Sequence, residues 1–143
     1  MQKNLLIMSE MPQYFVNLAD KNFNTHKLWL QSDEDKFISE IQEKVDAIAV
    51  MGGYKITPEL MKSMTNLKII ACYGVGYDAI DIAYAKSLGI KVTNTPEVLN
   101  DEVADTAIAL MLCVYRKILE ADKFARNNSW VNGEFPLTKI FSG

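Results

Sequence analysis

Two glycine-containing segments carry the clearest chemistry in the sequence. The segment Gly74-Val75-Gly76-Tyr77-Asp78-Ala79 follows an apolar run and has G-x-G-x-x-A spacing, and Gly52-Gly53 follows the preceding apolar run. Main-chain N–H groups in a glycine turn at the carboxyl end of a parallel sheet can donate hydrogen bonds to an anion in the adjacent crevice. The residue types therefore indicate anion binding by the backbone rather than by charged side chains.

The segment 74–79 allows three interpretations. A dinucleotide fingerprint would place a pyrophosphate here, but it normally follows the first strand, and the next apolar run ends in Thr93-Asn94 where an acid should hold the ribose. Asp78 would also repel phosphate. A plain tight turn would need glycine, with a positive φ available at Gly76. The third interpretation is a small-anion site.

The small-anion interpretation makes specific assignments. The N–H groups of Val75 and Gly76 would donate to one carboxylate, and Gly52 and Gly53 would form the other lip of the site. A carboxylate needs only two such donors, so this interpretation requires no acid after the following strand.

Composition excludes several classes of protein. The 143 residues are 49% hydrophobic with a net charge of −3, which argues against disorder and against general nucleic-acid binding. The longest wholly apolar run, Ala107 to Val114, is too short to cross a membrane, and no signal peptide is visible, so we expect a cytoplasmic protein. Cys72 and Cys113 have no metal-ligand spacing, and we expect neither a metal site nor a disulfide.

Short apolar runs alternate with helical patterns over the first hundred residues. Strands are expected at 5–8, 24–30, 47–51, 67–72 and 90–93, and helices at 12–18, 33–44, from Thr57-Pro58 onward, and from an Asp78 cap to Gly89. This alternation predicts an α/β fold with a doubly wound, parallel, five-stranded sheet.

The last third of the chain has a different pattern. From Glu102 to Arg126 the sequence predicts one unbroken helix, about 37 Å long, for which Asn100 is a plausible cap. The run 107–114 is hydrophobic on every side of that helix, which implies burial from several directions. A small sheet domain cannot cover it alone, so a second domain or a second chain is expected.

Three consecutive motifs resemble the D-isomer-specific 2-hydroxyacid dehydrogenase family: residues 73–81, 89–99 and 103–107. The resemblance extends along essentially the whole chain. It implies a flavodoxin-like substrate-binding domain at 1–99, an interdomain crossover helix at 100–126, and a connecting segment at 127–143 leading toward a separate Rossmann domain that holds NAD or NADP.

The resemblance also implies site residues. Val75 and Gly76 match the main-chain donors to the substrate carboxylate, the Val75 side chain would face the cofactor, and Val103 matches a position near the nicotinamide. The substrate would be a small 2-keto or 2-hydroxy acid; glyoxylate, hydroxypyruvate and phosphohydroxypyruvate all fit.

No catalytic residue is assigned within this chain. The family's arginine and histidine are expected beyond Gly143. His26 is interpreted as a surface or packing residue, and Arg116 and Arg126 as helix-terminus charges.

Two functions therefore stay open. The chain is either the substrate-binding part of an NAD(P)-dependent dehydrogenase, inactive by itself, or a non-catalytic module that binds a small carboxylate or self-associates. In both cases a homodimer through the crossover helix is expected, with no nucleic acid and no membrane as partner.

Overall fold

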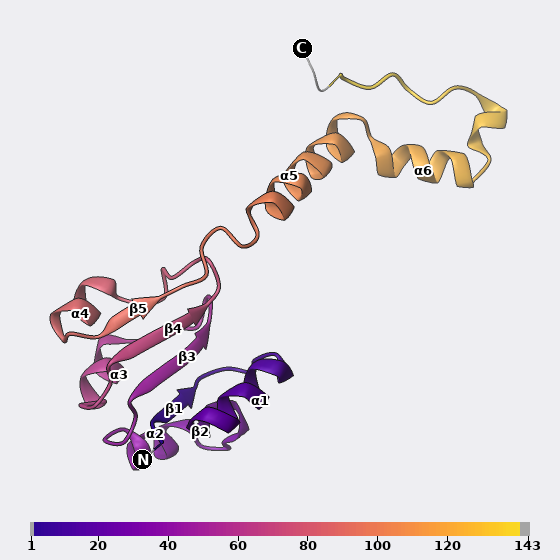
Figure 1. Cartoon of the computed structure of the whole chain (residues 1–143). Helices are drawn as coiled ribbons and strands as arrows, with labels where there is room; N and C mark the ends of the chain where they lie inside the picture. Colours follow the sequence, from indigo (N-terminus) through magenta and orange to yellow (C-terminus); the bar gives the residue numbers. More distant parts are fainter. Residues whose placement is uncertain (1, 141–143) are drawn as a thin grey trace. The chain divides into compact units, whose positions relative to one another are not determined.

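The computed structural model describes residues 2–140 and divides into two compact units, Met1–Val98 and Leu99–Gly143 (Figure 1). Each unit is described by itself. Residues 141–143, the end of the expected connecting segment 127–143, lie outside the described residues.

The first unit is built on a five-stranded sheet in which every neighbouring pair of strands is parallel. The strand order is β2-β1-β3-β4-β5, where the strands are β1 (Asn4–Ile7), β2 (Asn24–Lys27), β3 (Ala47–Met51), β4 (Ile69–Tyr73) and β5 (Lys91–Thr93). This is the flavodoxin-like order, and it confirms the predicted fold class. The second expected strand is shorter than predicted, because Leu28–Leu30 forms a 3-10 turn.

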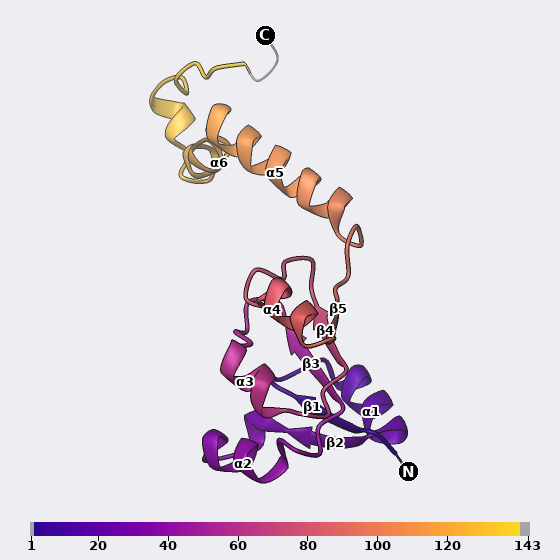
Figure 2. The same cartoon turned by 90° about the vertical axis from the view of Figure 1, so that its left-hand side faces the viewer.

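Helices cover both faces of the sheet. On one face, α1 (Gln13–Asn22) packs Val16 and Ala19 against the strands. The other face is covered by α2 (Glu34–Ile41), α3 (Pro58–Ser63) and α4 (Ile82–Ser87), each of which contributes a residue to the larger core cluster. Figure 2 shows α1 on the opposite side of the strands from α2 and α3.

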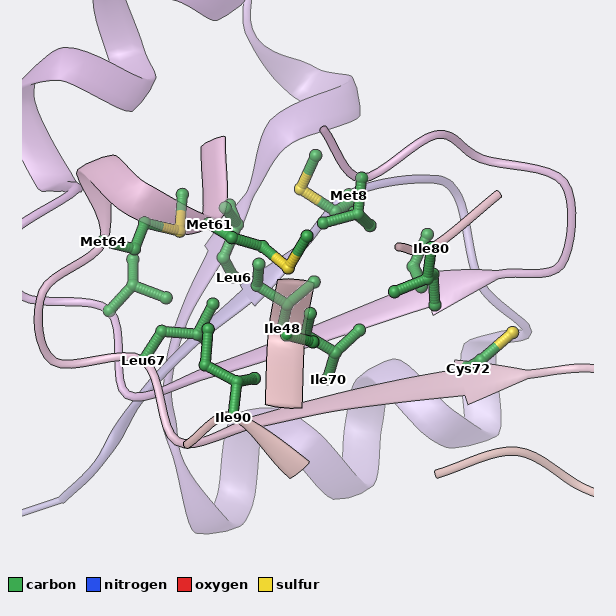
Figure 3. Packing of buried hydrophobic residues seen from close by; sticks show 14 of the residues in the cluster. Leu6, Met8, Ile48, Met61, Met64, Leu67, Ile70, Cys72, Ile80 and Ile90 are labelled. Atoms are coloured by element: carbon green, nitrogen blue, oxygen red, sulfur yellow. The ribbon is translucent and has the colours of Figure 1, made fainter. Parts of the chain in front are cut away.

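The centre of the core is a row of three apolar side chains across three strands. Leu6 pairs in register with Ile48, and Ile48 pairs with Ile70. All three are 0% exposed and pack with methionines of α3 and its end (Figure 3). Burial of each such side chain stabilises the fold by about 1.5–3 kcal/mol. The first unit therefore has its own hydrophobic core, between the sheet and the helices α2, α3 and α4.

Of two helix caps predicted from the sequence, the structure confirms one and contradicts the other. Thr57 caps α3 as expected, because its hydroxyl accepts from the Leu60 N–H at 3.2 Å. The expected Asp78 cap of α4 is wrong: Asp81 is the cap and accepts from the Tyr84 N–H at 2.9 Å. The segment before it cannot be helical, because Ile80 is buried and forms a parallel bridge with Ile56.

The second unit contains α5 (Asn100–Tyr115), α6 (Ile118–Arg126) and a 3-10 turn, Ser129–Asn132. The expected single helix from 102 to 126 is therefore wrong. The helix stops at Arg116, and Lys117 takes a left-handed conformation with φ 48° and ψ 45°. Asn100 is also not the cap, since Leu99 occupies that position without a side-chain hydrogen bond.

The second unit has no core of its own among the residues that the structure describes. Neither α5 nor α6 contains a buried residue. One aromatic contact, between Phe124 and Phe135, links α6 to the segment after the 3-10 turn, with ring centroids 5.4 Å apart. In the described part of the chain, no helix combines the length and hydrophobicity that a transmembrane span requires.

Candidate functional site

The two predicted glycine loops lie side by side at the carboxyl edge of the sheet. Met51 and Tyr73 end β3 and β4 in register, so Gly52 follows one strand where Gly74 follows the other. The Gly52 N–H donates to the Tyr73 carbonyl at 3.3 Å. A Cβ on Gly74 would lie 3.4 Å from the Gly52 Cα, so the two backbones are in contact. Glycine at both positions permits this close approach.

The backbone conformation corrects one expectation for the turn. Gly53 has a positive φ of 91°, but neither Gly74 nor Gly76 does. A Cβ on Gly76 would meet only the Asp78 carboxylate, at 3.7 Å. The requirement for glycine therefore arises from loop-to-loop contact at Gly52 and Gly74, and not from a left-handed residue at Gly76.

Three successive carbonyl groups of the turn are held by hydrogen bonds. The Thr95 N–H donates to the Gly74 carbonyl at 2.9 Å. The Asn94 side-chain amide donates to the Val75 carbonyl at 2.9 Å. The Cys72 thiol donates to the Gly76 carbonyl at 3.4 Å. Each of these bonds fixes the plane of one peptide group in the turn.

The held carbonyls set the direction of three N–H groups. In a trans peptide the carbonyl and the following N–H point in opposite directions, so the N–H groups of Val75, Gly76 and Tyr77 point away from their tethers. Within residues 2–140 none of these three N–H groups donates a hydrogen bond. Unpaired, oriented N–H groups at this edge of a parallel sheet are donors for an anion.

The same geometry does not fit a pyrophosphate. Helix α4 begins only at Ile82, and the side chain of Asp81 already caps it. After β5 there is no acid for a ribose, because Asn94 occupies that position and donates to Val75. The Asp78 carboxylate beside Gly76 opposes a multiply charged ligand. The turn thus lacks both the helix N-terminus and the acid of a dinucleotide site.

A small cavity of about 210 Å³ borders the turn on the α1 side of the sheet. It is lined by Met11, Phe15, Ala49, Ala71, Cys72, Tyr73, Thr93, Asn94 and Thr95. At its rim the Tyr14 and Tyr73 hydroxyls are 2.7 Å apart, and this hydrogen bond raises the pKa of Tyr14. The contact ties the start of α1 to the last residue before the turn.

His26 lies far from the turn. It is in β2, an edge strand that is three strands away from β4, and the register runs from His26 to Leu6 in β1, Ile48 in β3 and Ile70 in β4. Three strand spacings correspond to about 14 Å. The His26 Nε2 atom is 3.1 Å from the Asn4 side-chain oxygen, and partial burial, followed by the charge of Lys44, lowers its pKa. These contacts describe a packing histidine.

The remaining site predictions divide between the units. Gly52, Gly53, Val75 and Gly76 lie together in the first unit, whereas Val103 lies on α5 in the second. Val75 is 45% exposed and Val103 is 65% exposed. In the part of the chain that the structure describes, no cluster of three His, Cys, Asp or Glu side chains is arranged to hold a metal.

The residues that hold the turn were not predicted from the sequence. Asn94 and Thr95 follow β5, and the carboxyl ends of adjacent parallel strands meet at one edge of the sheet. The position of an asparagine side chain directly after β5, beside a glycine turn whose carbonyls need donors, could have predicted this hydrogen bond. Cys72 gave no such signal, since its role depends on burial, which raises the pKa of the thiol and keeps it a donor.

Comparison with known proteins agrees with this architecture. Glyoxylate/hydroxypyruvate reductase A of Arabidopsis thaliana is 35% identical over 139 residues, which is 97% of this chain and 44% of that protein. The crystal structure of a 2-hydroxyacid dehydrogenase from Ketogulonicigenium vulgare superimposes with a TM-score of 0.88 and 35% identity, over 98% of this chain and 45% of the other. The chain thus spans less than half the length of these relatives.

A further similar structure contains ligands. The NADPH-dependent glyoxylate/hydroxypyruvate reductase of Sinorhizobium meliloti, solved with NADP and malonate, matches with a TM-score of 0.82 and 34% identity, over 100% of this chain and 44% of that one. The sequence model of the family described as "D-isomer specific 2-hydroxyacid dehydrogenase, catalytic domain" matches residues 5–136 of this chain. From this match and the five-stranded parallel sheet, we conclude that the chain belongs to the D-isomer specific 2-hydroxyacid dehydrogenase family.

Proposed function

We propose that this chain is the substrate-binding part of an NAD(P)-dependent 2-hydroxyacid dehydrogenase. In this proposal the N–H groups of Val75 and Gly76 hold the carboxylate of a small 2-keto acid. The observation that carries the proposal is the set of tethered carbonyls at Gly74 and Val75, which leaves the two N–H groups oriented and unpaired. Hydrogen bonds from N–H groups to a charged acceptor are stronger than those between neutral groups.

The substrate class follows from the size and charge of the site. One carboxylate needs two donors and brings one charge, which the nearby Asp78 opposes less than it would a pyrophosphate. Relatives of this chain act on glyoxylate and hydroxypyruvate, as their names state, and one was crystallised with malonate, a small dicarboxylate. We therefore assign a small 2-keto acid as substrate.

The residues of this chain contribute little to cofactor binding in this proposal. Val75 and Val103, the two positions assigned to the cofactor, carry apolar side chains that can pack on a nicotinamide ring but cannot neutralise phosphates. The glycine turn does not fit a pyrophosphate either. When bound, NAD or NADP supplies the hydride. Holding the substrate carboxylate is the task that we assign to this chain's own residues.

We expect these 143 residues alone to lack hydride-transfer activity. His26 is three strands away from the turn, and the Nε atoms of Arg116 and Arg126 donate to Thr138 and Asp122 in the second unit. No proton donor for a keto oxygen is therefore assigned beside the turn.

The assay uses the purified chain with NADH or NADPH and a panel of 2-keto acids, and we expect the rate to equal the blank. Calorimetry with pyruvate should still detect binding. Val75→Ala keeps both N–H groups and should change the affinity little. A rate above the blank that follows the protein through purification, and not a host contaminant, would contradict the assignment.

We also propose self-association through α5, as a homodimer. Ile108, Leu110 and Val114 are all exposed apolar residues on α5, and within the described residues of the second unit nothing buries this helix. If about 400 Å² became buried between two chains, the gain would be on the order of 10 kcal/mol before the entropy cost of association. This is the alternative, non-catalytic role of the chain. A cytoplasmic location stays a prediction from sequence.

Light scattering tests the homodimer. We expect the mass of two chains for the wild type and the mass of one chain for Leu110→Glu. A monomeric wild type at high concentration would refute self-association through α5.

A further inference from the structure

The side chain of Asn94 is one of the groups that hold the glycine turn on which the proposed function depends. Asn94 follows β5, at the place where a dinucleotide-binding fold would have an acid, and its side-chain amide donates 2.9 Å to the Val75 carbonyl on the neighbouring strand's turn. The side chain is half-buried and borders the small cavity beside the turn. It is the one side-chain amide that bonds to the turn among the residues the structure describes.

The bond acts on one peptide group. The Val75 carbonyl and the Gly76 N–H belong to the same trans peptide, so a donor on the carbonyl side fixes the direction of the N–H on the other side. The preceding peptide is held separately, because the Gly74 carbonyl accepts from the main-chain N–H of Thr95. The Val75 N–H is thus set by backbone, and the Gly76 N–H is set by a side chain.

No other described hydrogen bond is made to this peptide itself; the Cys72 thiol holds the Gly76 carbonyl, which belongs to the following peptide. Gly76 has no side chain to restrict rotation, and Asp78 approaches it only at the distance of ordinary contact. Glycine flanks the peptide and gives the backbone more accessible conformations than any other residue would. Without a donor on the Val75 carbonyl, the Gly76 N–H would lose its preferred direction.

We propose that Asn94 is a positioning residue for carboxylate binding: its amide orients the Gly76 N–H toward the substrate carboxylate without touching the substrate. A donor that is already oriented binds an anion without the cost of ordering the peptide. The inference rests on the proposed function, because it assigns a role in the same site. In this proposal Asn94 orients the Gly76 N–H donor and has no effect on the Val75 N–H donor.

The test is a titration of the isotope-labelled chain with pyruvate at constant ionic strength, followed by the amide resonances in NMR spectra. In the wild type, both the Val75 and Gly76 amide protons should shift as pyruvate binds. In Asn94→Ala, pyruvate should bind about three- to tenfold more weakly, as expected for loss of one hydrogen bond. At saturation the Gly76 response should be lost while the Val75 response remains.

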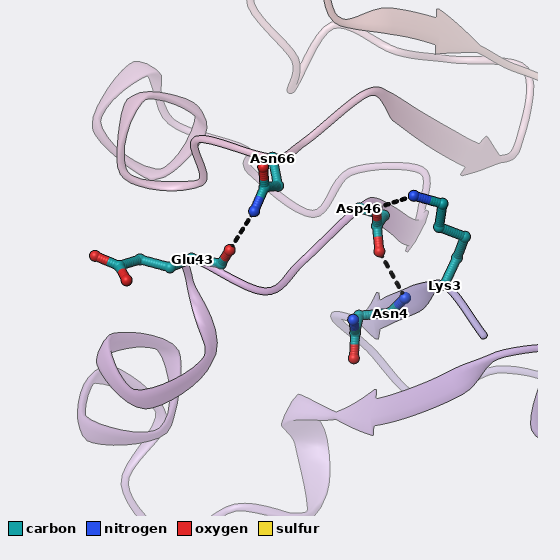
Figure 4. A network of polar contacts seen from close by, with 5 residues as sticks. All are labelled: Lys3, Asn4, Glu43, Asp46 and Asn66. Atoms are coloured by element: carbon teal, nitrogen blue, oxygen red, sulfur yellow. Dashed lines mark hydrogen bonds and ion pairs between the residues drawn. The ribbon is translucent and has the colours of Figure 1, made fainter. Parts of the chain in front are cut away.

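Asn66→Ala is the matched control. Asn66 is an exposed asparagine whose side-chain amide also donates to a backbone carbonyl, that of Glu43 (Figure 4), and it has no contact with the glycine turn among the described hydrogen bonds. It should lose similar stability in urea and keep the wild-type response to pyruvate. Asn94→Ser, which is neutral and too short to reach the Val75 carbonyl, should behave as Asn94→Ala.

The outcomes separate the two proposals. If the wild-type Val75 and Gly76 resonances do not respond to pyruvate, the proposed function falls. If they respond equally in the wild type and in Asn94→Ala, the carboxylate site stands and the role of Asn94 is refuted. Equal loss of both responses in Asn94→Ala would also refute it, because a general structural role would disturb both donors.

Discussion

The two units of this chain differ in whether their apolar side chains are buried. Within residues 2–140, every buried hydrophobic side chain belongs to the first unit, from Leu5 to Ile90. The second unit buries none, although Ala107 to Val114 is the longest apolar run in the sequence. Apolar residues become a core only where another layer faces them, and the first unit supplies such layers on both sides of its sheet.

The same contrast separates the parts of the candidate site. The glycine turn follows β4, whose residues Ile70 and Cys72 belong to the larger core cluster, and it contacts the loop after β3, a strand that is buried on both faces. Val103 lies on a helix with no packed face among the described residues. The proposed carboxylate site therefore lies in the unit with a packed core, and the proposed cofactor position lies in the unit without one.

The largest expected effect compares the same substitution in the two units. Leu6→Ala removes a side chain that is 0% exposed and should lower the free energy of unfolding by about 2–5 kcal/mol. Leu110→Ala, at a position that is 62% exposed in the single chain, should change the free energy of unfolding of the monomer by about 0.5 kcal/mol or less. Urea denaturation of both variants, at protein concentrations at which light scattering finds a monomer, measures the difference. Equal losses at those concentrations would mean that Leu110 is buried by its own chain.

The next effect concerns the contact between the glycine loops. Gly74→Val would press a branched side chain onto Gly52 and should destabilise the first unit by about 1–3 kcal/mol, with loss of pyruvate binding. Val75→Ala, one residue further along, should leave both properties nearly unchanged. The measurements are urea denaturation and calorimetry. A stable Gly74→Val variant that binds pyruvate normally would show that the close approach of the loops is not required.

Helix caps give a smaller effect with a clear contrast. Asp81→Ala removes the cap of α4 and should cost about 1 kcal/mol, because the Tyr84 N–H loses its acceptor. Asn100→Ala, at the start of α5, should cost little, since Asn100 makes no capping bond. Thermal unfolding monitored by circular dichroism measures both. A larger loss of stability from Asn100→Ala than from Asp81→Ala would show that Asn100 does cap α5, as the sequence predicted.

The smallest effect is electrostatic and depends on pH. Asp46 accepts from Lys3 Nζ at 2.8 Å and from the Asn4 N–H at 2.9 Å, joining the starts of β1 and β3 (Figure 4). The hydrogen bond from Lys3, followed by that from Asn4, lowers the pKa of Asp46. A lowered carboxyl pKa stabilises the fold above the unfolded value of about 4, and this contribution is lost as pH falls through the folded value.

The control for this effect lies in the second unit. Asp46→Asn should remove part of the acid-induced loss of stability, measured by urea denaturation at a series of pH values. Asp122→Asn breaks an exposed pair with Arg126 within one helix and should have almost no effect at any pH. An equal response from both variants would show that the strand-linking pair is no stronger than a local surface pair.

The sequence predicted β1 and β3 well because these two strands are buried on both faces. The run 47–51 is β3 without any shift of its ends, since a continuous apolar run has one interpretation in a parallel sheet. The choice between Asp78 and Asp81 as a cap could not be made from sequence, because it depends on the long-range bridge between Ile56 and Ile80. The break at Lys117 has neither glycine nor proline to mark it.

The candidate site was predicted in part, for a similar reason. Glycines after neighbouring strands indicated where the backbone would be open, and Gly52 and Gly74 do meet there. The direction of the N–H groups could not be predicted, because it depends on donors from Asn94, Thr95 and Cys72, which the fold brings to the turn. The spacing of the glycines predicts where the turn lies, whereas the direction of its N–H groups depends on tertiary contacts.

The most direct test of the carboxylate site is a crystal structure of this chain grown with pyruvate. We predict density for a carboxylate whose oxygens lie about 2.9 Å from the main-chain nitrogens of Val75 and Gly76, with the carbonyls of Gly74 and Val75 still turned away from it. Pyruvate bound elsewhere, or a turn whose Val75 and Gly76 N–H groups donate to the protein itself, would contradict the account.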